Sequence, residues 1–289
     1  MDKIIQSEVV GMEIIGSVLT YYSEALQDIQ RLINRFYDRY SEDGKLSIQE
    51  INKKLTYLER REFLQAVRPK LDILEQTVRE TYSKEELAQL TRLQALTDEI
   101  EMDLEIVGIK EEDRCRVGFK EIIAIGYLTN FVVKTIKDKK ANAILNRKWI
   151  DRKNWYNRVW KNNKTLKKEV EKVVKVGVNK GWSNQKMARM LDERLNVGKF
   201  RSTRLVRTES NYMVNQATLQ RFKDDGMQYY RFNAQLDNRT SEICESLDGQ
   251  VFKLEDASVG TNYPPMHANC RSTEEGIPDK TYLTDDDKV

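Results

Sequence analysis

Proline is scarce in this sequence, and Pro69 is the only one in the first 263 residues. Proline interrupts helices and central strands, so a stretch almost without it favours helix. Apolar residues in the same stretch recur at steps of three and four, as at Ile15, Val18 and Tyr22. This is the spacing of a helix with one buried face. The sequence therefore predicts a mainly α protein.

Long apolar runs and a targeting segment are also missing. The longest apolar run, residues 122–133, contains Thr129 and Asn130 and is too short to span a bilayer, so we expect a buried helix there and no membrane-spanning segment. The first residues lack the basic start and the small-residue cleavage site of a signal peptide. Three cysteines form no regular framework, which favours synthesis in a reducing cytoplasm.

The small net charge of +3 hides a strongly basic middle segment. Residues 139–207 carry 21 Lys and Arg against five Asp and Glu, and residues 146–168 also hold three of the four tryptophans. Basic side chains interleaved with aromatic ones suit DNA or an acidic protein surface, and the alternative is a solvated helical face. The candidate contact residues are Arg147, Lys148, Arg152, Lys153, Arg158, Lys161, Lys164, Lys167 and Lys168.

Capping motifs predict where two helices begin. Ser47 with Glu50, and Ser83 with Glu86, have the spacing of a capping box, in which a hydroxyl and a carboxylate each satisfy a backbone N–H. Both pairs fall within residues 1–140, which we predict to be a region of long helices.

Glycine divides the helices predicted later in the chain. Ser183 is expected to cap a short helix over residues 184–195 that Gly198 closes. A longer helix over residues 200–224 follows.

The alternation typical of strands appears only beyond residue 226. Segments 227–236 and 250–254 show it, and Asp248-Gly249 before the second is a turn signal. We therefore predict a second domain over residues 141–289 with a motif core at 200–275. In it, basic helices lead to a small α+β module, whose short β-hairpin or small sheet is closed by a loop containing Cys and His.

One face of the predicted helix over residues 200–224 carries polar side chains in register. Arg207, Asn211 and Asn215 lie at i, i+4 and i+8, with Thr208 and Glu209 beside them. Asparagine is unfavourable in mid-helix, so two in register suggest hydrogen bonds to another segment. A polar face that pins a neighbouring loop is favoured over catalysis, because no clear general base accompanies these residues.

Cys244, His267 and Cys270 have the spacing C-x22-H-x2-C. They could supply three of four zinc ligands, with Asp237 as the fourth, although a tight CxxC knuckle would need cysteine where Ser241 stands. Three alternatives stay open. The thiols could be buried neighbours, they could form a disulfide, or His267 could bridge backbone carbonyls in a rigid loop.

Motifs of common enzymes are absent from the sequence. It has no Gly-rich phosphate loop, no GxSxG, no HExxH and no cluster of metal-spaced carboxylates. A thiol nucleophile or a metal-dependent nuclease built on His267, the only histidine, would need an orienting third group. We therefore do not expect an enzyme.

Three motifs occur in order in the C-terminal part: RLVRTESNYMVNQA (204–217), YRFNAQLDNRTSEICESLDGQVF (230–252) and PPMHANCRS (264–272). Together they resemble the phage head morphogenesis, or Mu F-like minor head, protein family. The positions that carry the resemblance are Arg207, Thr208, Glu209, Asn211, Asn215, Asp237, Arg239, Thr240, Pro265, Asn269 and Arg271.

The resemblance implies a low-copy virion component of a tailed phage or prophage, located in the capsid interior or at the portal vertex and made in the cytoplasm of a bacterial host. Its implied partners are the portal protein, capsid or scaffold proteins, and DNA. It would assist head assembly and the packaging or ejection of DNA. A metal-dependent nuclease or toxin-like effector using His267 is the alternative, and zinc is the one cofactor considered.

Overall fold

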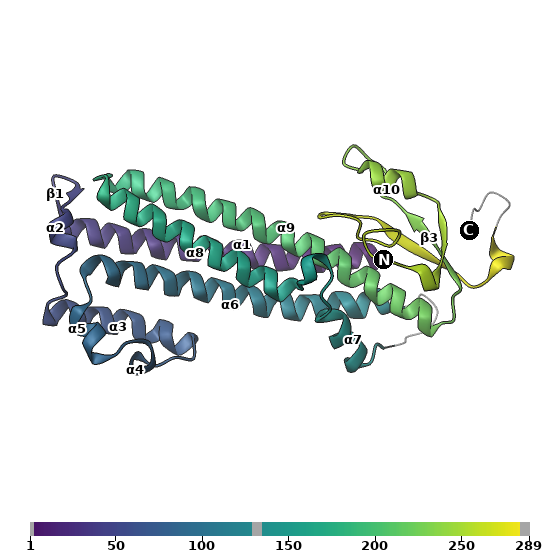
Figure 1. Ribbon diagram of the computed structural model, residues 1–289, viewed down its shortest axis with the longest axis horizontal. Coiled ribbons are helices and arrows are strands. Elements are labelled where there is room, and N and C mark those ends of the chain that lie inside the picture. Colours follow the sequence, from purple (N-terminus) through teal and green to yellow (C-terminus); the bar gives the residue numbers. More distant parts are fainter. Residues whose placement is uncertain (1–2, 129–134, 284–289) are drawn as a thin grey trace. The chain divides into compact units, whose positions relative to one another are not determined.

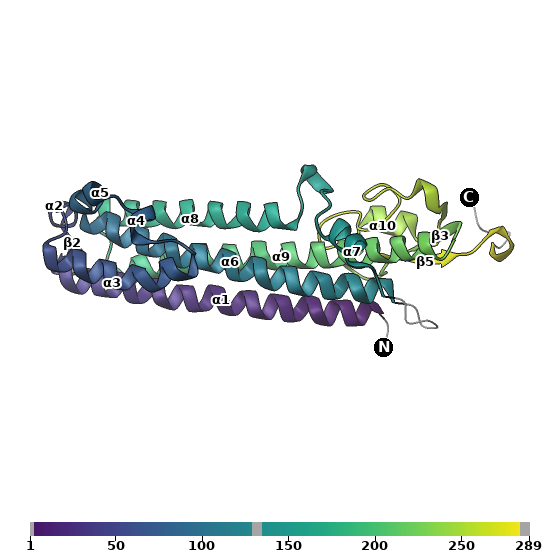
Figure 2. The same ribbon diagram turned by 90° about the horizontal axis from the view of Figure 1, so that it is seen from below.

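The structure, a computed structural model, describes residues 3–128 and 135–283 (Figures 1 and 2). It confirms a mainly α fold with a small C-terminal sheet. The α-helices of the described residues are α1 (Lys3–Tyr40), α2 (Ile48–Ile51), α3 (Tyr57–Ile73), α4 (Val78–Thr81), α5 (Lys84–Gln89), α6 (Arg92–Tyr127), α7 (Asp138–Leu145), α8 (Trp155–Asn179), α9 (Asn184–Asp224) and α10 (Glu242–Leu247). The strands are β1 (Ser41–Glu42), β2 (Lys45–Leu46), β3 (Tyr229–Asn233), β4 (Val251–Lys253) and β5 (Thr273–Ile277).

The chain forms two compact units, each built from separate stretches of sequence. One unit, here the sheet unit, comprises Met1–Gly16, Arg114–Arg158 and Ser202–Val289. The other, here the bundle unit, comprises Ser17–Asp113 and Val159–Arg201. The helices α1, α6, α8 and α9 therefore contribute residues to both units. The domain boundary between residues 140 and 141 stays a prediction.

In the bundle unit, parts of α1, α6, α8 and α9 lie side by side in both ribbon views (Figures 1 and 2). The Tyr37 hydroxyl of α1 donates a hydrogen bond of 2.7 Å to the carbonyl of Trp182, in the turn between α8 and α9. Gly181 in that turn has φ +58°, a left-handed conformation that glycine adopts without strain. The long N-terminal helices thus form a bundle together with the basic helices.

The helix break predicted at Gly198 is wrong. Ser183 caps α9 as predicted, because its Oγ accepts a hydrogen bond of 3.3 Å from the backbone N of Lys186. The helix then continues to Asp224. A Cβ at Gly198 would lie 2.6 Å from Cε1 of Tyr22, so this glycine allows close packing against α1 and does not end the helix.

Capping motifs begin the short helices of the bundle unit. The predicted box of Ser83 and Glu86 is present at α5, and Ser47 caps α2 through its hydroxyl. Equivalent boxes at Thr56 and Thr77 start α3 and α4. Neither box was predicted, although both follow the same spacing rule.

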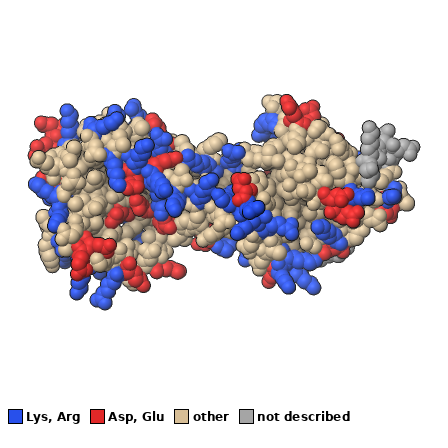
Figure 3. Space-filling model, in the orientation of Figure 1, with Lys and Arg blue, Asp and Glu red and all other residues tan. Residues whose placement is uncertain are grey.

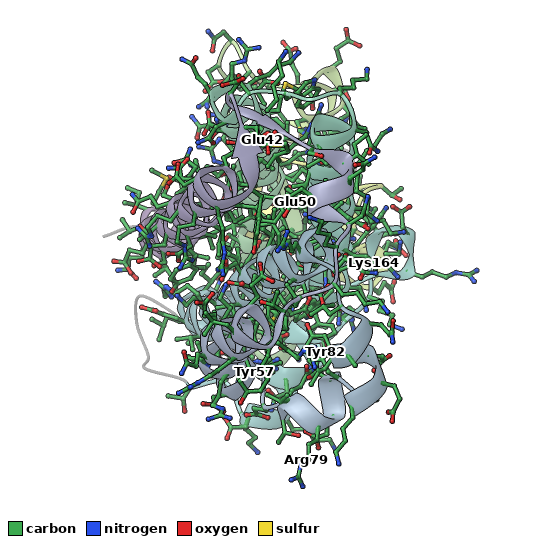
Figure 4. All side chains as sticks on the ribbon, turned by 90° about the vertical axis from the view of Figure 1, so that its left-hand side faces the viewer. Glu42, Glu50, Tyr57, Arg79, Tyr82 and Lys164 are labelled. Carbon is green, nitrogen blue, oxygen red and sulfur yellow. The ribbon has the colours of Figure 1, made fainter. Side chains whose placement is uncertain are left out.

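An apolar cluster attaches α3 to α6. Phe63, Val67 and Leu71 of α3 are buried in one cluster with Met102 of α6. Tyr82, labelled in Figure 4, packs against the same cluster and donates a hydrogen bond of 2.8 Å to Asp98 of α6. The short helices are therefore held by apolar burial and by a specific polar contact.

In the sheet unit, β3 lies between β4 and β5, and both pairings are antiparallel. Strands β3 and β4 fall inside the predicted segments, whereas β5 was not predicted. Its sequence, TEEGI, has two adjacent glutamates and a glycine, residues that are depleted in strands. The sheet packs on the C-terminal part of α9 through a buried cluster that includes Phe222, Tyr230 and Tyr263.

One prediction falls partly on residues outside the described ranges. Ile122 and Ile123 are buried in α6, as predicted for the apolar run over 122–133, but residues 129–133 are not among the described residues. The tail beyond residue 283 is also outside them. Among the described helices, none combines the length and apolar character needed to cross a membrane.

Candidate functional site

The polar face of α9 holds the loop that leads into β5. The side-chain amides of Asn211 and Asn215 both donate to the backbone carbonyl of Ser272, at 3.3 and 3.2 Å. Thr208 Oγ1 accepts a hydrogen bond of 3.1 Å from the backbone N of Asn269, whose φ of +60° places it in the left-handed region. These contacts fix the loop against the helix. Arg207, which the helical spacing places nearby, is exposed.

A turn at Asp237 is joined to the same loop. Asp237 Oδ1 accepts a hydrogen bond of 2.8 Å from the backbone N of Arg239, and Thr240 Oγ1 accepts one of 2.7 Å from the backbone N of Asp237. The Arg271 guanidinium donates to both carboxylate oxygens of Asp237 at 2.6 Å. That cation holds the pKa of the Asp237 carboxyl well below its usual range.

Cys244, His267 and Cys270 come together, and their ligand atoms all lie within 4.8 Å of one another. Cys244 Sγ of α10 is 3.3 Å from His267 Nε2 and 3.8 Å from Cys270 Sγ. The sulfur–sulfur distance far exceeds the roughly 2.05 Å of a disulfide. Two thiolates bound to one tetrahedral zinc at about 2.3 Å would be about 3.8 Å apart. The spacing of the two sulfurs therefore fits a shared zinc ion.

Asp237, the predicted fourth ligand, is not part of this group. Both of its carboxylate oxygens are engaged by Arg271, and the metal-spaced group in the described part of the chain contains only the two cysteines and the histidine. The polar atom beside that group belongs to Ser241, whose Oγ lies 2.8 Å from His267 Nε2. The same Oγ caps α10 by accepting from the backbone N of Cys244 at 3.3 Å.

Several of the predicted contact residues are engaged inside the protein. Arg147 Nη1 donates a hydrogen bond of 3.0 Å to Gln216 Oε1, and Arg158 forms an ion pair with Glu209. In the bundle unit, Lys167 pairs with Glu105. The charges of Arg158 and Lys167 are therefore neutralised within the protein, whereas Arg147 meets a neutral amide and keeps its positive charge.

Other predicted contact residues are open to solvent. Lys161, Lys164 and Lys168 are exposed on α8 at i, i+3 and i+7, which places them on one helix face. Figure 4 shows the Lys164 side chain extending away from the protein. In the sheet unit Lys148 and Arg152 are exposed, whereas Lys153 is half-buried. Figure 3 shows basic side chains interspersed with acidic ones on one face.

The aromatic residues assigned to an interface form internal contacts instead. Trp155 is buried and packs edge-on against Phe119, with ring centroids 5.6 Å apart. Trp149 stacks on Tyr212 at 4.3 Å. These rings are internal because the basic segment packs onto an apolar core. Composition alone does not show whether an aromatic ring faces solvent or the core.

Glu209 lies at the centre of a buried polar group whose members could not be linked from the sequence. Its side chain is 1% exposed, and it accepts hydrogen bonds from Arg158 Nη1 and, at 3.1 Å, from Trp149 Nε1. Burial raises the pKa of the Glu209 carboxyl, and the nearby Arg158 guanidinium opposes that rise. Pairing is what makes a buried carboxylate tolerable at this position.

Comparison with protein families gives a match over residues 168–274, to the family described as Phage Mu protein F like protein. Residues 168–274 are therefore similar to the phage Mu protein F-like family. The Mu F-like segment begins in α8, ends in β5 and includes the polar face of α9, the Asp237 turn and the Cys/His group. Comparisons with curated proteins and with solved structures give no match.

Proposed function

We propose that this chain is a minor head protein of a tailed phage or prophage, which associates with the portal vertex and assists head assembly and the packaging or ejection of DNA. The observation that carries the proposal is the Mu F-like segment over residues 168–274, because that family is one of phage head proteins. The motif resemblance to minor head proteins supplies the finer role.

The chemistry of the site supports a structural role for this segment. Asn211 and Asn215 are engaged with Ser272, and Asp237 with Arg271, so each polar group already holds two stretches of chain together. The alternative, a metal-dependent nuclease, is not favoured. Two thiols and an imidazole are typical donors for zinc, whereas Mg²⁺ and Mn²⁺ prefer carboxylate and other oxygen ligands.

A zinc ion is part of the proposal. Cys244, His267 and Cys270 would hold it, and the sulfur spacing supports this assignment. The nearest further polar side chain is Ser241, whose hydroxyl lies 2.8 Å from His267 Nε2. Zinc in such a site stabilises a fold by cross-linking it. Here it would tie α10 to the loop that precedes β5.

The exposed lysines of α8 are the proposed contact surface of the bundle unit. Lys161, Lys164 and Lys168 lie on one helix face, and a cationic face of this kind attracts an acidic protein surface or DNA. We favour an acidic surface of the portal, because three charges on one helix give only weak and salt-sensitive binding to DNA.

Mass spectrometry of purified heads tests the proposed role. Heads would be isolated from the phage or prophage that encodes this chain, with tail assembly blocked, and analysed beside the major capsid protein. We expect the chain in these tailless heads at a few copies per major-capsid shell. Its presence in the lysate together with its absence from heads would contradict the proposal, and tail proteins serve as the control for carry-over.

A further inference from the structure

The sheet unit contains a pocket to which the proposed function assigns no role. The pocket encloses about 270 Å³ between the segment preceding α8, the middle of α9 and the Pro265 loop. Its principal lining residues are Arg147, Trp149, Tyr212, Gln216, Pro265 and Met266. Four of these six fall inside the Mu F-like segment, so the pocket lies among its motifs.

Two polar side chains of α9 line this pocket with donors that lack acceptors. Tyr212 and Gln216 are only 0% and 3% exposed. Over residues 3–128 and 135–283, neither the Tyr212 hydroxyl nor Gln216 Nε2 has a hydrogen-bond acceptor. Gln216 Oε1 accepts from Arg147, which fixes the orientation of the amide and leaves its N–H groups unpaired. Buried donors are normally satisfied, so these point to a bound acceptor.

The charge in the pocket comes from Arg147. The neighbouring carboxylate of Glu209 is already neutralised by Arg158 and accepts from the Trp149 indole N–H. Arg147 itself forms no ion pair among the described residues, and its side-chain partners are neutral: the amide of Gln216 and the oxygen of the Tyr212 hydroxyl. The pocket thus offers a guanidinium, a hydroxyl and an amide N–H, all donors, around a single positive charge. The complementary ligand is an acceptor with one negative charge.

The remaining lining of the pocket is mainly apolar. One face of the Trp149 ring is stacked on Tyr212 at 4.3 Å, and the Arg158 guanidinium lies over the indole at 5.1 Å. A ligand would meet this indole together with Pro265 and Met266. These groups suit a compact apolar body and do not provide further charge.

We infer that this pocket binds a monocarboxylate carried on an apolar body. A dianionic phosphate would bring two charges against one guanidinium, and an internal phosphodiester of DNA would need room for chain on both sides within about 270 Å³. A carboxylate, in contrast, matches the single charge and the planar geometry of Arg147. It comes either from a small organic acid or from an acidic side chain of a partner protein. The inference does not depend on the proposed head function.

NMR of the full chain tests the inference through the indole N–H resonance of Trp149, assigned by its loss in Trp149→Phe. We expect benzoate to shift this resonance saturably, with millimolar or tighter affinity, and benzyl alcohol, which lacks the carboxylate, to leave it unchanged. Arg147→Gln should weaken benzoate binding about tenfold or more. Arg152→Gln, an exposed change in the same segment, is the matched control and should preserve affinity. The other indole resonances report whether each variant is folded.

Further ligands separate the two sources of the carboxylate. Binding of a peptide with an internal glutamate as tightly as benzoate would support a partner side chain as the source. Preference for benzoate would support a small acid. Tighter binding of inorganic phosphate than of either carboxylate would overturn the inference, as would the lack of a saturable shift in the wild-type chain at about 20 mM ligand.

Discussion

The side-chain amide of Asn215 donates a hydrogen bond of 3.2 Å to the backbone carbonyl of Ser272, 57 residues further along the chain. Asn215 lies on α9, and Ser272 directly precedes β5. This bond, together with the one from Asn211 to the same carbonyl, holds the edge strand against the helix. The asparagines of the motif are therefore structural supports of the Mu F-like segment.

Replacing Asn215 by alanine should destabilise the protein. Asn215→Ala removes one of the two donors to a buried carbonyl, and we expect a loss of about 1–3 kcal/mol in the free energy of unfolding. Urea denaturation measures the loss. Gln185→Ala, an exposed change on the same helix, should stay within about 0.5 kcal/mol of wild type. Equal effects of the two substitutions would show that the Asn215 contact contributes nothing.

The ion pair between Arg158 and Glu209 should give a pH-dependent effect when it is broken. Arg158→Met leaves a buried carboxylate without its counter-charge, and we expect a loss of about 3–5 kcal/mol at pH 8. Burial already raises the pKa of Glu209, and removal of Arg158 raises it further. The folded state then takes up a proton before the unfolded state as pH falls, so the loss should shrink between pH 8 and pH 5.

Chemical denaturation of Arg158→Met across this pH range checks the sign. The double variant Arg158→Met/Glu209→Gln lacks the titrating group and is the control, because its difference from wild type should not shrink in the same way. A loss in Arg158→Met that grows as the solution is acidified would contradict the assignment of Glu209 as the uncompensated group.

Two helical glycines should respond in opposite directions to alanine. A Cβ at Gly126 would lie 2.6 Å from the backbone oxygen of Val214, which cannot move aside like a flexible side chain. We expect Gly126→Ala to destabilise the fold by about 1–3 kcal/mol. A Cβ at Gly16 meets nothing within 4 Å, so Gly16→Ala should stabilise α1 by up to about 1 kcal/mol. Thermal unfolding distinguishes them, and a lower Tm for Gly16→Ala than for Gly126→Ala would be the contrary result.

The zinc proposal predicts about one zinc per chain in protein purified without chelator. Elemental analysis measures the content, and Co²⁺ substitution should give the absorption bands of thiolate ligation. Cys244→Ser and Cys270→Ser should each lose the metal, whereas Cys115→Ser, a change in α6, should retain it. Removal of zinc should lower the Tm. The proposal would be refuted if protein from zinc-supplemented cells contained no zinc and if added Co²⁺ gave no thiolate absorption bands.

Local sequence rules account for much of the fold. The three- and four-residue apolar spacing predicts the long helices, and the cap at Ser83 marks the start of α5 correctly. Such signals are local because they depend on neighbours within one or two turns. The break wrongly expected at Gly198 shows their limit. Whether a glycine ends a helix or admits a packed side chain depends on a distant residue, here Tyr22.

The candidate site was only partly predictable, because local spacing shows which residues share a helix face but not which distant residues they contact. The i, i+4 spacing places Asn211 and Asn215 on one face, but only the fold shows that both reach Ser272. The tryptophans of the basic segment were candidates for an interface, whereas Trp155 is buried and Trp149 stacks internally. The sequence pattern of a basic aromatic segment is the same whether its rings face solvent or the core.

Co-purification with the portal protein tests the central claim most directly. The chain would be co-expressed with the portal protein of the same phage, captured through a tag on the portal, and quantified by size-exclusion chromatography and mass spectrometry. We predict a complex at low salt that weakens as salt rises and in the triple variant Lys161→Glu/Lys164→Glu/Lys168→Glu. A folded chain that fails to co-purify with the assembled portal at low salt would contradict the account.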